Sequence, residues 1–222
     1  MILTTEVLNN SENGDNPIQQ YADFRATEIG GGYKVGTVNI EDIYDQFGYG
    51  VNGYSYCVRN FSNYMRVRWP EFKMVFIIGK ALDYSLRYKD TEIESLVPTY
   101  GNPGSDNLMF AEDRFTYPFV GTGRLAARNK QDVRNYLRKV TRHAALSEVS
   151  GKTIEERLWL KNIIHLSGAD EGLADALFGH LEEMRNVIEN GDFGGKIKTY
   201  RKTSSDPVQT EVSQDILKDI DN

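Results

Sequence analysis

The first third of the chain alternates between short apolar runs and apolar residues at helical spacing. Ile2-Leu3-Thr4-Thr5 forms a short apolar start, and Tyr33 to Ile40 is rich in β-branched residues. Between them, Pro17 opens a segment whose apolar positions recur at near-helical spacing up to the three glycines at 30–32. These runs predict a strand, a helix and a second strand.

A further pair of helices and a buried strand are predicted next. Glu41 to Phe47 spans one or two helical turns, and the apolar stripe from Val58 to Trp69 predicts a longer helix that Pro70 ends. Phe72 to Gly79 is a continuous apolar run, which is typical of a strand buried on both faces of a parallel sheet. Strands that alternate with helices in this way indicate βαβ units and an α/β fold.

The periodicity lapses over residues 80–117, where Tyr, Asp, Pro and Gly are frequent. A long irregular stretch inside a compact domain is more often functional than idle. A strand at Phe119 to Leu125 and a helix at Asn129 to Ala145 are predicted to follow. We interpret the polar segment from Leu146 to Thr153 as a linker. It divides the chain into an N-terminal α/β subdomain, 1–150, and the first part of a second subdomain, 151–222.

The second half repeats the order strand, helix, strand, helix. The predicted elements are a strand at Leu158 to Leu166, a helix at Ala169 to Asn190, a strand at Gly194 to Tyr200 and a final helix opened by Asp206-Pro207. In the first half the equivalent helix is followed by a buried strand, whereas this sequence stops at Asn222. We therefore expect that a central strand is missing and that the chain end falls inside a fold.

Composition narrows the classes of protein. There are 32 acidic and 26 basic residues, and the net charge of −6 argues against nucleic acid or anionic lipid as a partner. The longest apolar run, residues 74–79, is far shorter than the roughly 20 residues of a membrane-spanning helix. The N-terminus lacks the pattern of a signal peptide, which indicates a cytoplasmic protein or a piece of a longer exported chain. A single cysteine excludes an intramolecular disulfide and a cysteine-rich zinc site.

Candidate nucleophiles and bases are few. Cys57 lies in a predicted helix one residue off the apolar stripe, which favours packing over catalysis. His165 and Ser167 end a predicted strand, where α/β proteins bind ligands, but no G-x-S-x-G surrounds Ser167 and a helix-capping role fits it better. His143 and His180 lie on predicted helices without a second His or Cys at ligand spacing. No residue of this chain is predicted to be catalytic.

Phosphate-binding motifs are weak in this sequence. Ser150-Gly151-Lys152-Thr153 lacks the first glycine and the preceding strand of a P-loop. The glycines at 30–32 follow a helix, so they are a helix end and not a dinucleotide loop. The stretch from Glu6 to Asn16 has one glycine and three acids, which argues against a flavodoxin-like phosphate cradle after Thr5.

The tract from Val97 to Asn107 carries the most specific pattern. Its prolines and glycines fix the course of a loop that presents Asp106 between Ser105 and Asn107. The strand that includes Gly121 to Leu125 can lie beside it. The Asp106 carboxylate has three open interpretations: it recognises a basic group of a substrate, binds Ca²⁺, or caps a turn.

Taken in order, these segments resemble the gingipain-like cysteine peptidases, peptidase family C25. The sequence is most similar to the sortase-like members attached to type IX secretion in Bacteroidetes. Any single motif is weak, whereas the order and spacing of the motifs over nearly the whole chain are fairly specific. The matching segments are Ile2–Thr5, Val38–Phe47, Val58–Phe61, Val75–Lys80, Asp83-Tyr84, Val97–Asn107, Gly121–Leu125, Trp159–Asn162, His165–Gly168 and Ser205–Val208.

The resemblance implies a caspase-like α/β fold: an open, mostly parallel sheet flanked by helices, here truncated within the second of two subdomains. The family's catalytic His and Cys follow strands beyond a helix like Val212 to Asp221, so neither is expected in this sequence. The family's specificity pocket draws on the first subdomain, and this assigns substrate binding to Ser105, Asp106 and Asn107. No cofactor is implied with certainty, and Ca²⁺ near the acid-rich loop from Asp83 to Asp113 is a hypothesis.

The implied function is that of a cysteine peptidase or sortase that processes the C-terminal signals of secreted cargo. Its location would be extracellular or at the outer-membrane surface, as part of a longer exported protein, with cargo and outer-membrane secretion components as partners. The alternative is a non-catalytic α/β interaction module, a pseudoenzyme that binds secretion partners. The two hypotheses differ in the sequence that follows Asn222.

Overall fold

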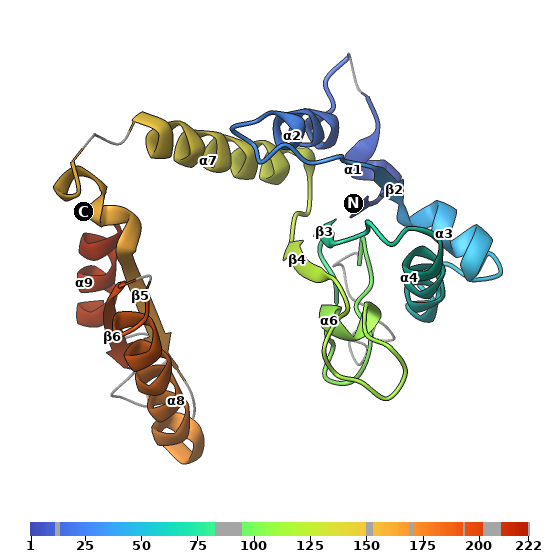
Figure 1. The fold of residues 1–222 in the computed structure, drawn as a ribbon. Helices are drawn as coiled ribbons and strands as arrows, with labels where there is room; N and C mark the ends of the chain where they lie inside the picture. Colours follow the sequence, from blue (N-terminus) through green and yellow to red (C-terminus); the bar gives the residue numbers. More distant parts are fainter. Residues whose placement is uncertain are drawn as a thin grey trace. The chain divides into compact units, whose positions relative to one another are not determined.

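The computed structural model divides after Ala145 into two compact units, residues 1–145 and 146–222, and each is considered by itself (Figure 1). It describes residues 1–11, 14–82, 95–149, 153–168, 171–192, 194–201 and 210–221.

The first unit is built on a four-stranded parallel sheet in the order β2-β1-β3-β4. The strands are β1 (Ile2–Thr4), β2 (Thr37–Asn39), β3 (Met74–Ile78) and β4 (Gly121–Leu125). Leu3 lies opposite both Val38 and Ile77, and Ile77 lies opposite Arg124. Because all four strands are parallel, their carboxyl ends lie at one edge of the sheet.

Helices connect and cover these strands. They are α1 (Glu6–Asn9), α2 (Pro17–Ala26), α3 (Ile40–Phe47), α4 (Tyr56–Arg68), α6 (Asp106–Met109) and α7 (Lys130–Val149). The start of α2 follows from local chemistry: the Asn16 side chain accepts hydrogen bonds from the Ile18 and Gln19 amides, and Pro17 occupies the first helical position.

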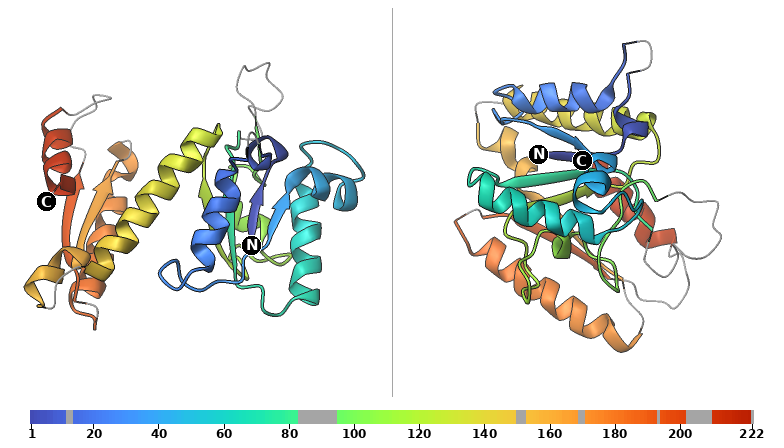
Figure 2. Two further views of the ribbon diagram at one scale, coloured as in Figure 1. Left: turned by 90° about the horizontal axis from the view of Figure 1, so that it is seen from above. Right: turned by 90° about the vertical axis from the view of Figure 1, so that its right-hand side faces the viewer.

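The core lies on both faces of this sheet. Leu3 belongs to a cluster with residues of α3 and α4, whereas its neighbour Ile2 belongs to a cluster with residues of α2 and α7. Figure 2 shows α2 and α4 on opposite sides of the strands. Leu3, Ile18 and Ile77 are fully buried, and truncation of such a side chain to alanine costs about 2–5 kcal/mol.

The second unit contains the 3₁₀ helix η1 (Glu155–Lys161), β5 (Asn162–Ser167), α8 (Glu171–Glu189), β6 (Lys196–Arg201) and α9 (Thr210–Asp221). The two strands are parallel and pair from Asn162 opposite Lys196 to Ser167 opposite Arg201. Among the described residues of this unit, Ile197 and Ser167 are the buried side chains. The apolar core of the chain is therefore concentrated in the first unit.

The structure confirms the α/β class with parallel strands flanked by helices, and it corrects several boundaries. The helix predicted to end at Ala145 continues to Val149, because neither Gly nor Pro occurs before Gly151. The first part of the strand predicted at Leu158 to Leu166 is instead η1. Here the Thr153 hydroxyl accepts from the Glu156 amide while the Glu156 carboxylate accepts from the Thr153 amide, a reciprocal pair like that of a capping box, one residue ahead of the N-cap position Ile154.

Smaller differences concern element ends in both units. The helix α2 ends at Ala26, before the predicted end next to Gly30, and β2 spans only Thr37–Asn39 of the predicted run. The predicted helix start at Asp206-Pro207 and the P-loop-like residues 150–152 lie outside the described residues.

Candidate functional site

The carboxyl edge of the first sheet is organised around Arg124 of the edge strand β4. Its guanidinium donates to the backbone carbonyls of Gly79 at 2.6 Å, Val97 at 2.9 Å and Pro98 at 3.1 Å. Nε and Nη2 each donate to one oxygen of the Asp106 carboxylate at 2.7 Å. This one side chain therefore joins the end of β3, the segment at residues 97–98 and the start of α6.

The Asp106 carboxylate is therefore engaged by the protein itself. The pair is bidentate, and the side chains of Arg124 and Asp106 are 12% and 24% exposed. Such paired geometry in a partly buried place is stronger than a surface ion pair. The sequence left three interpretations of the Asp106 carboxylate open. In the structure, the basic group that this carboxylate binds is Arg124, on the strand expected beside the tract.

Ser105 and Asn107 flank this pair. The Ser105 amide donates to the Tyr100 carbonyl at 2.8 Å and closes the turn over residues 100–105. Gly101 lies within it at φ +94°, and a Cβ there would approach the Leu108 side chain to 3.0 Å, so the turn needs glycine at this position. Ser105 is half-buried, whereas Asn107 is exposed. Asn107 is thus the member of the three that faces solvent.

A second arginine, which sequence analysis missed, supports the same loop from α4. The Arg59 side chain is 8% exposed, and its guanidinium lies 5.0 Å from the Tyr100 ring centre and 6.0 Å from that of Tyr56. It donates to the Leu108 carbonyl and, at 2.6 Å, to the Asp113 carboxylate. In the sequence, this arginine is visible only as a basic residue next to Val58, a position of the predicted apolar stripe. Such a neighbour is too common to identify a cluster.

The carboxyl end of β1 is closed by internal hydrogen bonds. The Thr4 hydroxyl donates to the Ile78 carbonyl at 3.0 Å, and the Thr5 hydroxyl donates to the Glu41 carboxylate at 2.5 Å. The other oxygen of Glu41 accepts from the Glu6 amide at 3.1 Å. An acidic group thus occupies the place where a phosphate cradle would need free amides, which agrees with the sequence argument against a phosphate site.

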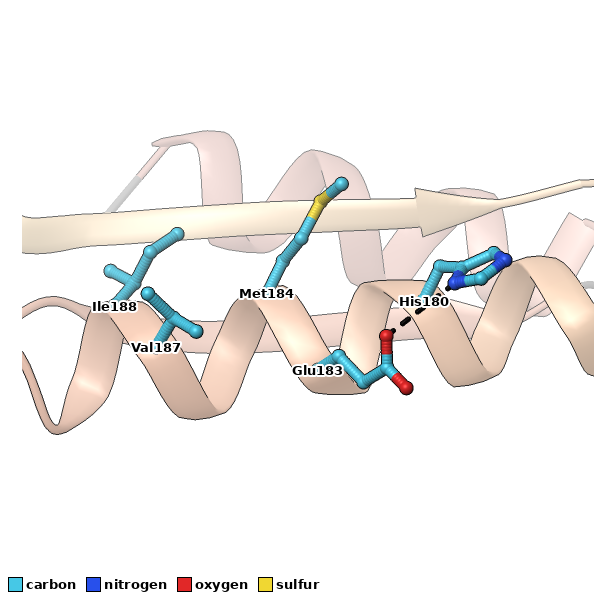
Figure 3. A pocket seen from close by; sticks show the side chains of 5 residues that line it. All are labelled: His180, Glu183, Met184, Val187 and Ile188. Atoms are coloured by element: carbon cyan, nitrogen blue, oxygen red, sulfur yellow. Dashed lines mark ion pairs between the residues drawn. The ribbon is translucent and has the colours of Figure 1, made fainter.

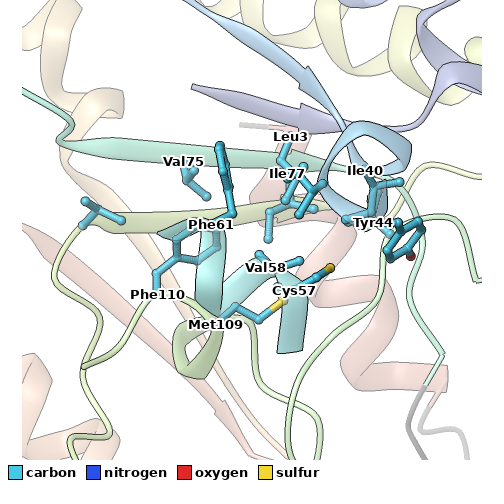
Figure 4. Close-up of a cluster of buried hydrophobic side chains, with 13 residues drawn as sticks. Leu3, Ile40, Tyr44, Cys57, Val58, Phe61, Val75, Ile77, Met109 and Phe110 are labelled. Atoms are coloured by element: carbon cyan, nitrogen blue, oxygen red, sulfur yellow. The ribbon is translucent and has the colours of Figure 1, made fainter. Parts of the chain in front are cut away.

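Cys57 is a core residue. Figure 4 shows its side chain among the buried residues that cover one face of the sheet. It is fully buried, and burial raises the pKa of its thiol to about 12. The reactive form of cysteine is the thiolate, so this thiol is suppressed as a nucleophile near neutral pH.

The histidines of this chain are far from Cys57 along the sequence. His165 is on β5, and its Nδ1 is buried without a hydrogen-bond partner among the described residues. His180 Nδ1 lies 3.5 Å from the Glu183 carboxylate on the same helix, and both side chains are largely exposed. Figure 3 shows this pair beside Met184, Val187 and Ile188, around a shallow hollow of about 340 Å³. All five residues that line this hollow lie on α8.

Metal binding was expected, if anywhere, on the acid-rich loop between Asp83 and Asp113. Asp83 and the acids up to Glu94 lie outside the described residues. In the described part, Asp106, Glu112 and Asp113 pair with Arg124, Arg66 and Arg59. Within the residues that the structure describes, no group of three His, Cys, Asp or Glu side chains is placed to hold a metal ion.

In the same part of the chain, no helix is both long and apolar enough to cross a membrane.

The fold and this edge define an α/β protein with parallel sheets flanked by helices and a loop tract fixed at the carboxyl ends of the strands. A family model described as peptidase family C25 matches residues 1–222. The chain belongs to peptidase family C25, which confirms the gingipain-like assignment made from the sequence.

Comparison with individual proteins adds little beyond the family. The crystal structure of dimeric latent PorU from Porphyromonas gingivalis is similar, with 14% sequence identity and a TM-score of 0.45. The similarity covers 78% of this chain and 20% of that chain, so the present chain spans about a fifth of that protein's length. No curated protein matches.

Proposed function

We propose that this chain is the N-terminal portion of a gingipain-like cysteine peptidase or sortase that processes cargo of the type IX secretion pathway. The observation that carries the proposal is the match of the peptidase family C25 model to residues 1–222. In this proposal the catalytic His and Cys belong to polypeptide beyond residue 222, and the whole protein works at the cell surface or outside the cell.

The residues of the chain support a scaffolding part in such an enzyme. Cysteine peptidases need a thiolate next to a base, whereas the pKa of Cys57 is raised by burial. The chain alone would therefore not hydrolyse peptides.

We further propose that Ser105, Asp106 and Asn107 contribute to substrate binding. Their position after the carboxyl ends of β3 and β4 supports this, because open parallel sheets bind ligands at that edge. Asp106 has both oxygens on Arg124, so its part is to hold the segment, while the exposed Asn107 amide is free to face a peptide.

The experiment uses the natural gene product, purified with all residues that its gene encodes, and peptides that carry the C-terminal signal of secreted cargo. We expect cleavage or transpeptidation that an alkylating agent abolishes, and none by the 222-residue chain. Asn107→Ala should raise KM with little change in kcat, and the exposed Asn186→Ala on α8 is the matched control. A gene product without turnover that still binds the peptides would replace the proposal with a non-catalytic interaction module.

A further inference from the structure

Three tyrosines form a row beside the turn over residues 100–105. The ring centres of Tyr54 and Tyr56 are 6.1 Å apart, and those of Tyr56 and Tyr100 are 5.9 Å apart. Tyr54 and Tyr56 are 42% and 38% exposed, and Tyr100 is half-buried. Tyrosine combines a large apolar ring with a polar tip and is therefore frequent in binding surfaces. This tyrosine row presents such rings, partly exposed, to solvent.

The start of α4 holds two members of the tyrosine row in place. The Cys57 amide donates to the Tyr54 carbonyl at 3.1 Å, and the Val58 amide donates to the Ser55 carbonyl at 3.2 Å. Cys57 and Val58 are fully buried in the core that covers one face of the first sheet. The backbone of Tyr54 and Tyr56 is thus fixed by a helical turn and by the core, so that little ordering is needed when a ligand binds.

The third member connects the tyrosine row to the segment proposed to bind substrate. Tyr100 pairs with Ser105 across the turn. The guanidinium of Arg59 lies 5.0 Å from the Tyr100 ring centre and donates to the Leu108 carbonyl. Leu108 directly follows the exposed Asn107 in the sequence. The tyrosine row and Asn107 therefore belong to one locally packed region.

The charges around the tyrosine row disfavour a basic ligand. Arg59 is buried and lies against two rings of the row. Its guanidinium pairs with the Asp113 carboxylate at 2.6 Å, and both oxygens of Asp106 accept from Arg124. A basic ligand group would meet a cation already placed at the rings, and it would find both of these carboxylates paired.

A further aromatic ring suits the tyrosine row better than an aliphatic side chain does. Aromatic pairs favour tilted, offset or edge-to-face arrangements with ring centres about 4.5–7 Å apart. The two spacings within the row fall in that range, with interplanar angles of 34° and 54°. A ligand ring can therefore extend the same pattern. Such a pair strengthens binding by about two- to tenfold beyond the effect of the area it buries.

We propose that the tyrosine row is a subsite for an aromatic side chain of an extended peptide, next to Asn107. The inference rests on the proposed function, because the ligand is taken to be a peptide substrate, and it adds the class of side chain that this substrate presents. The peptide backbone reaches the Asn107 amide while its aromatic ring packs against Tyr54 and Tyr56. A substrate selected here is therefore aromatic, and not basic, at one position.

Titration of the isotope-labelled 222-residue chain, followed by NMR, tests this subsite. The probes are acetylated octapeptides of glycine and serine that differ at one central position, which is Phe, Tyr, Leu, Arg or Ala. We expect the Phe and Tyr peptides to bind at least about fivefold more tightly than the Leu and Ala peptides. The signals that shift should include those of Tyr54, Tyr56 and Asn107, and the Arg peptide should bind no more tightly than the Ala peptide.

Substitutions in α4 separate the tyrosine row from aromatic residues in general. Tyr56→Leu should reduce the preference for Phe over Leu to less than about twofold. The matched control is Tyr64→Leu on the same helix, which is 44% exposed and packs against Phe47 and Trp69, and it should keep the preference. Tyr54→Leu, at the other end of the row from the turn, is a second removal if Tyr56→Leu lowers the melting temperature.

Four results would overturn the proposal. They are equal binding of the Phe and Ala peptides, tightest binding of the Arg peptide, a preference for Phe that survives in both Tyr56→Leu and Tyr54→Leu, and signals of the row that shift with protein concentration alone, which would assign it to a second copy. Turnover enters none of these readouts. A gene product that cleaves peptides while its tyrosine row shows no aromatic preference contradicts this inference alone, and aromatic binding without turnover contradicts the proposed function alone.

Discussion

Arg124 and Asp106 show how a residue pair can hold a loop without being a reaction site. A buried or partly buried ion pair is costly to break from one side, because the remaining charge loses its partner. Arg124 in addition satisfies three backbone carbonyls that no regular strand pairing covers. The sequence predicted that this loop lies beside β4 but left the partner of Asp106 open. Arg124 is 18 residues away from Asp106 along the chain, and whether the two side chains meet depends on the register of β3 and β4, in which Ile77 lies opposite Arg124.

We predict that Arg124→Ala lowers the free energy of unfolding by about 3 kcal/mol, since it leaves the Asp106 carboxylate and three carbonyls without their donor. Chemical denaturation of the 222-residue chain measures the change. The control is Arg142→Ala on the exposed face of α7, which should change stability by less than about 0.5 kcal/mol. Equal effects of the two substitutions would show that the Arg124 network does not stabilise the loop.

At the level of helices and strands, prediction succeeded where the apolar pattern was long or continuous. The strand at Met74–Ile78 and the helix at Tyr56–Arg68 follow directly from such patterns. The 3₁₀ helix at Glu155–Lys161 was misread because Leu158 and Leu160 alternate as in a strand, while the reciprocal hydrogen bonds of Thr153 and Glu156 at its start were overlooked. The contacts of Arg59 could not be predicted, because they depend on where residues 100–113 pack against α4.

The edge of β6 gives a pH-dependent prediction. The Ile197 amide, and secondarily Arg185, lower the pKa of Glu189 in the folded protein. Because the pKa is lowered in the folded protein, the ionised Glu189 carboxylate stabilises the fold at pH values above the usual pKa of 4.5. This stabilisation is lost as the pH falls through the pKa of Glu189 in the folded protein. Glu189→Gln should therefore speed exchange of the Ile197 amide at pH 7, and the difference from wild type should shrink below about pH 4.5.

Amide exchange measured by NMR at several pH values follows this difference. Glu183→Gln serves as the control, because the Glu183 side chain is 80% exposed and pairs with the exposed His180 on the same helix. A difference between wild type and Glu189→Gln that stays constant from pH 7 to pH 3 would contradict a role for the carboxylate charge at this edge.

In the residues that the structure describes, buried apolar side chains are distributed unequally between the two units. Nearly all buried apolar residues belong to residues 1–145, and the described part of residues 146–222 buries Ile197. Hydrophobic burial must offset the loss of chain entropy before a domain folds alone. The described part of the second unit buries far less apolar surface than the first, so we expect it to depend on further contacts for its stability.

We predict that residues 1–149 unfold cooperatively on heating, whereas residues 153–222 expressed alone show no cooperative transition. Circular dichroism of the two pieces and of the 222-residue chain checks this directly. The break is placed after the end of α7, so that no helix is cut. A sharp melting transition of the isolated 153–222 piece would mean that its sheet is complete with two strands.

The proposal that catalysis belongs to polypeptide outside these 222 residues is tested most directly by finding which cysteine reacts. The natural gene product is treated at pH 7 with a thiol-directed peptidase inhibitor, and the modified residue is identified by peptide mapping. We predict a modified cysteine beyond residue 222 and an unmodified Cys57, because the Cys57 thiol is buried and its pKa is about 12. Modification of Cys57 with matching loss of peptide cleavage would contradict this assignment.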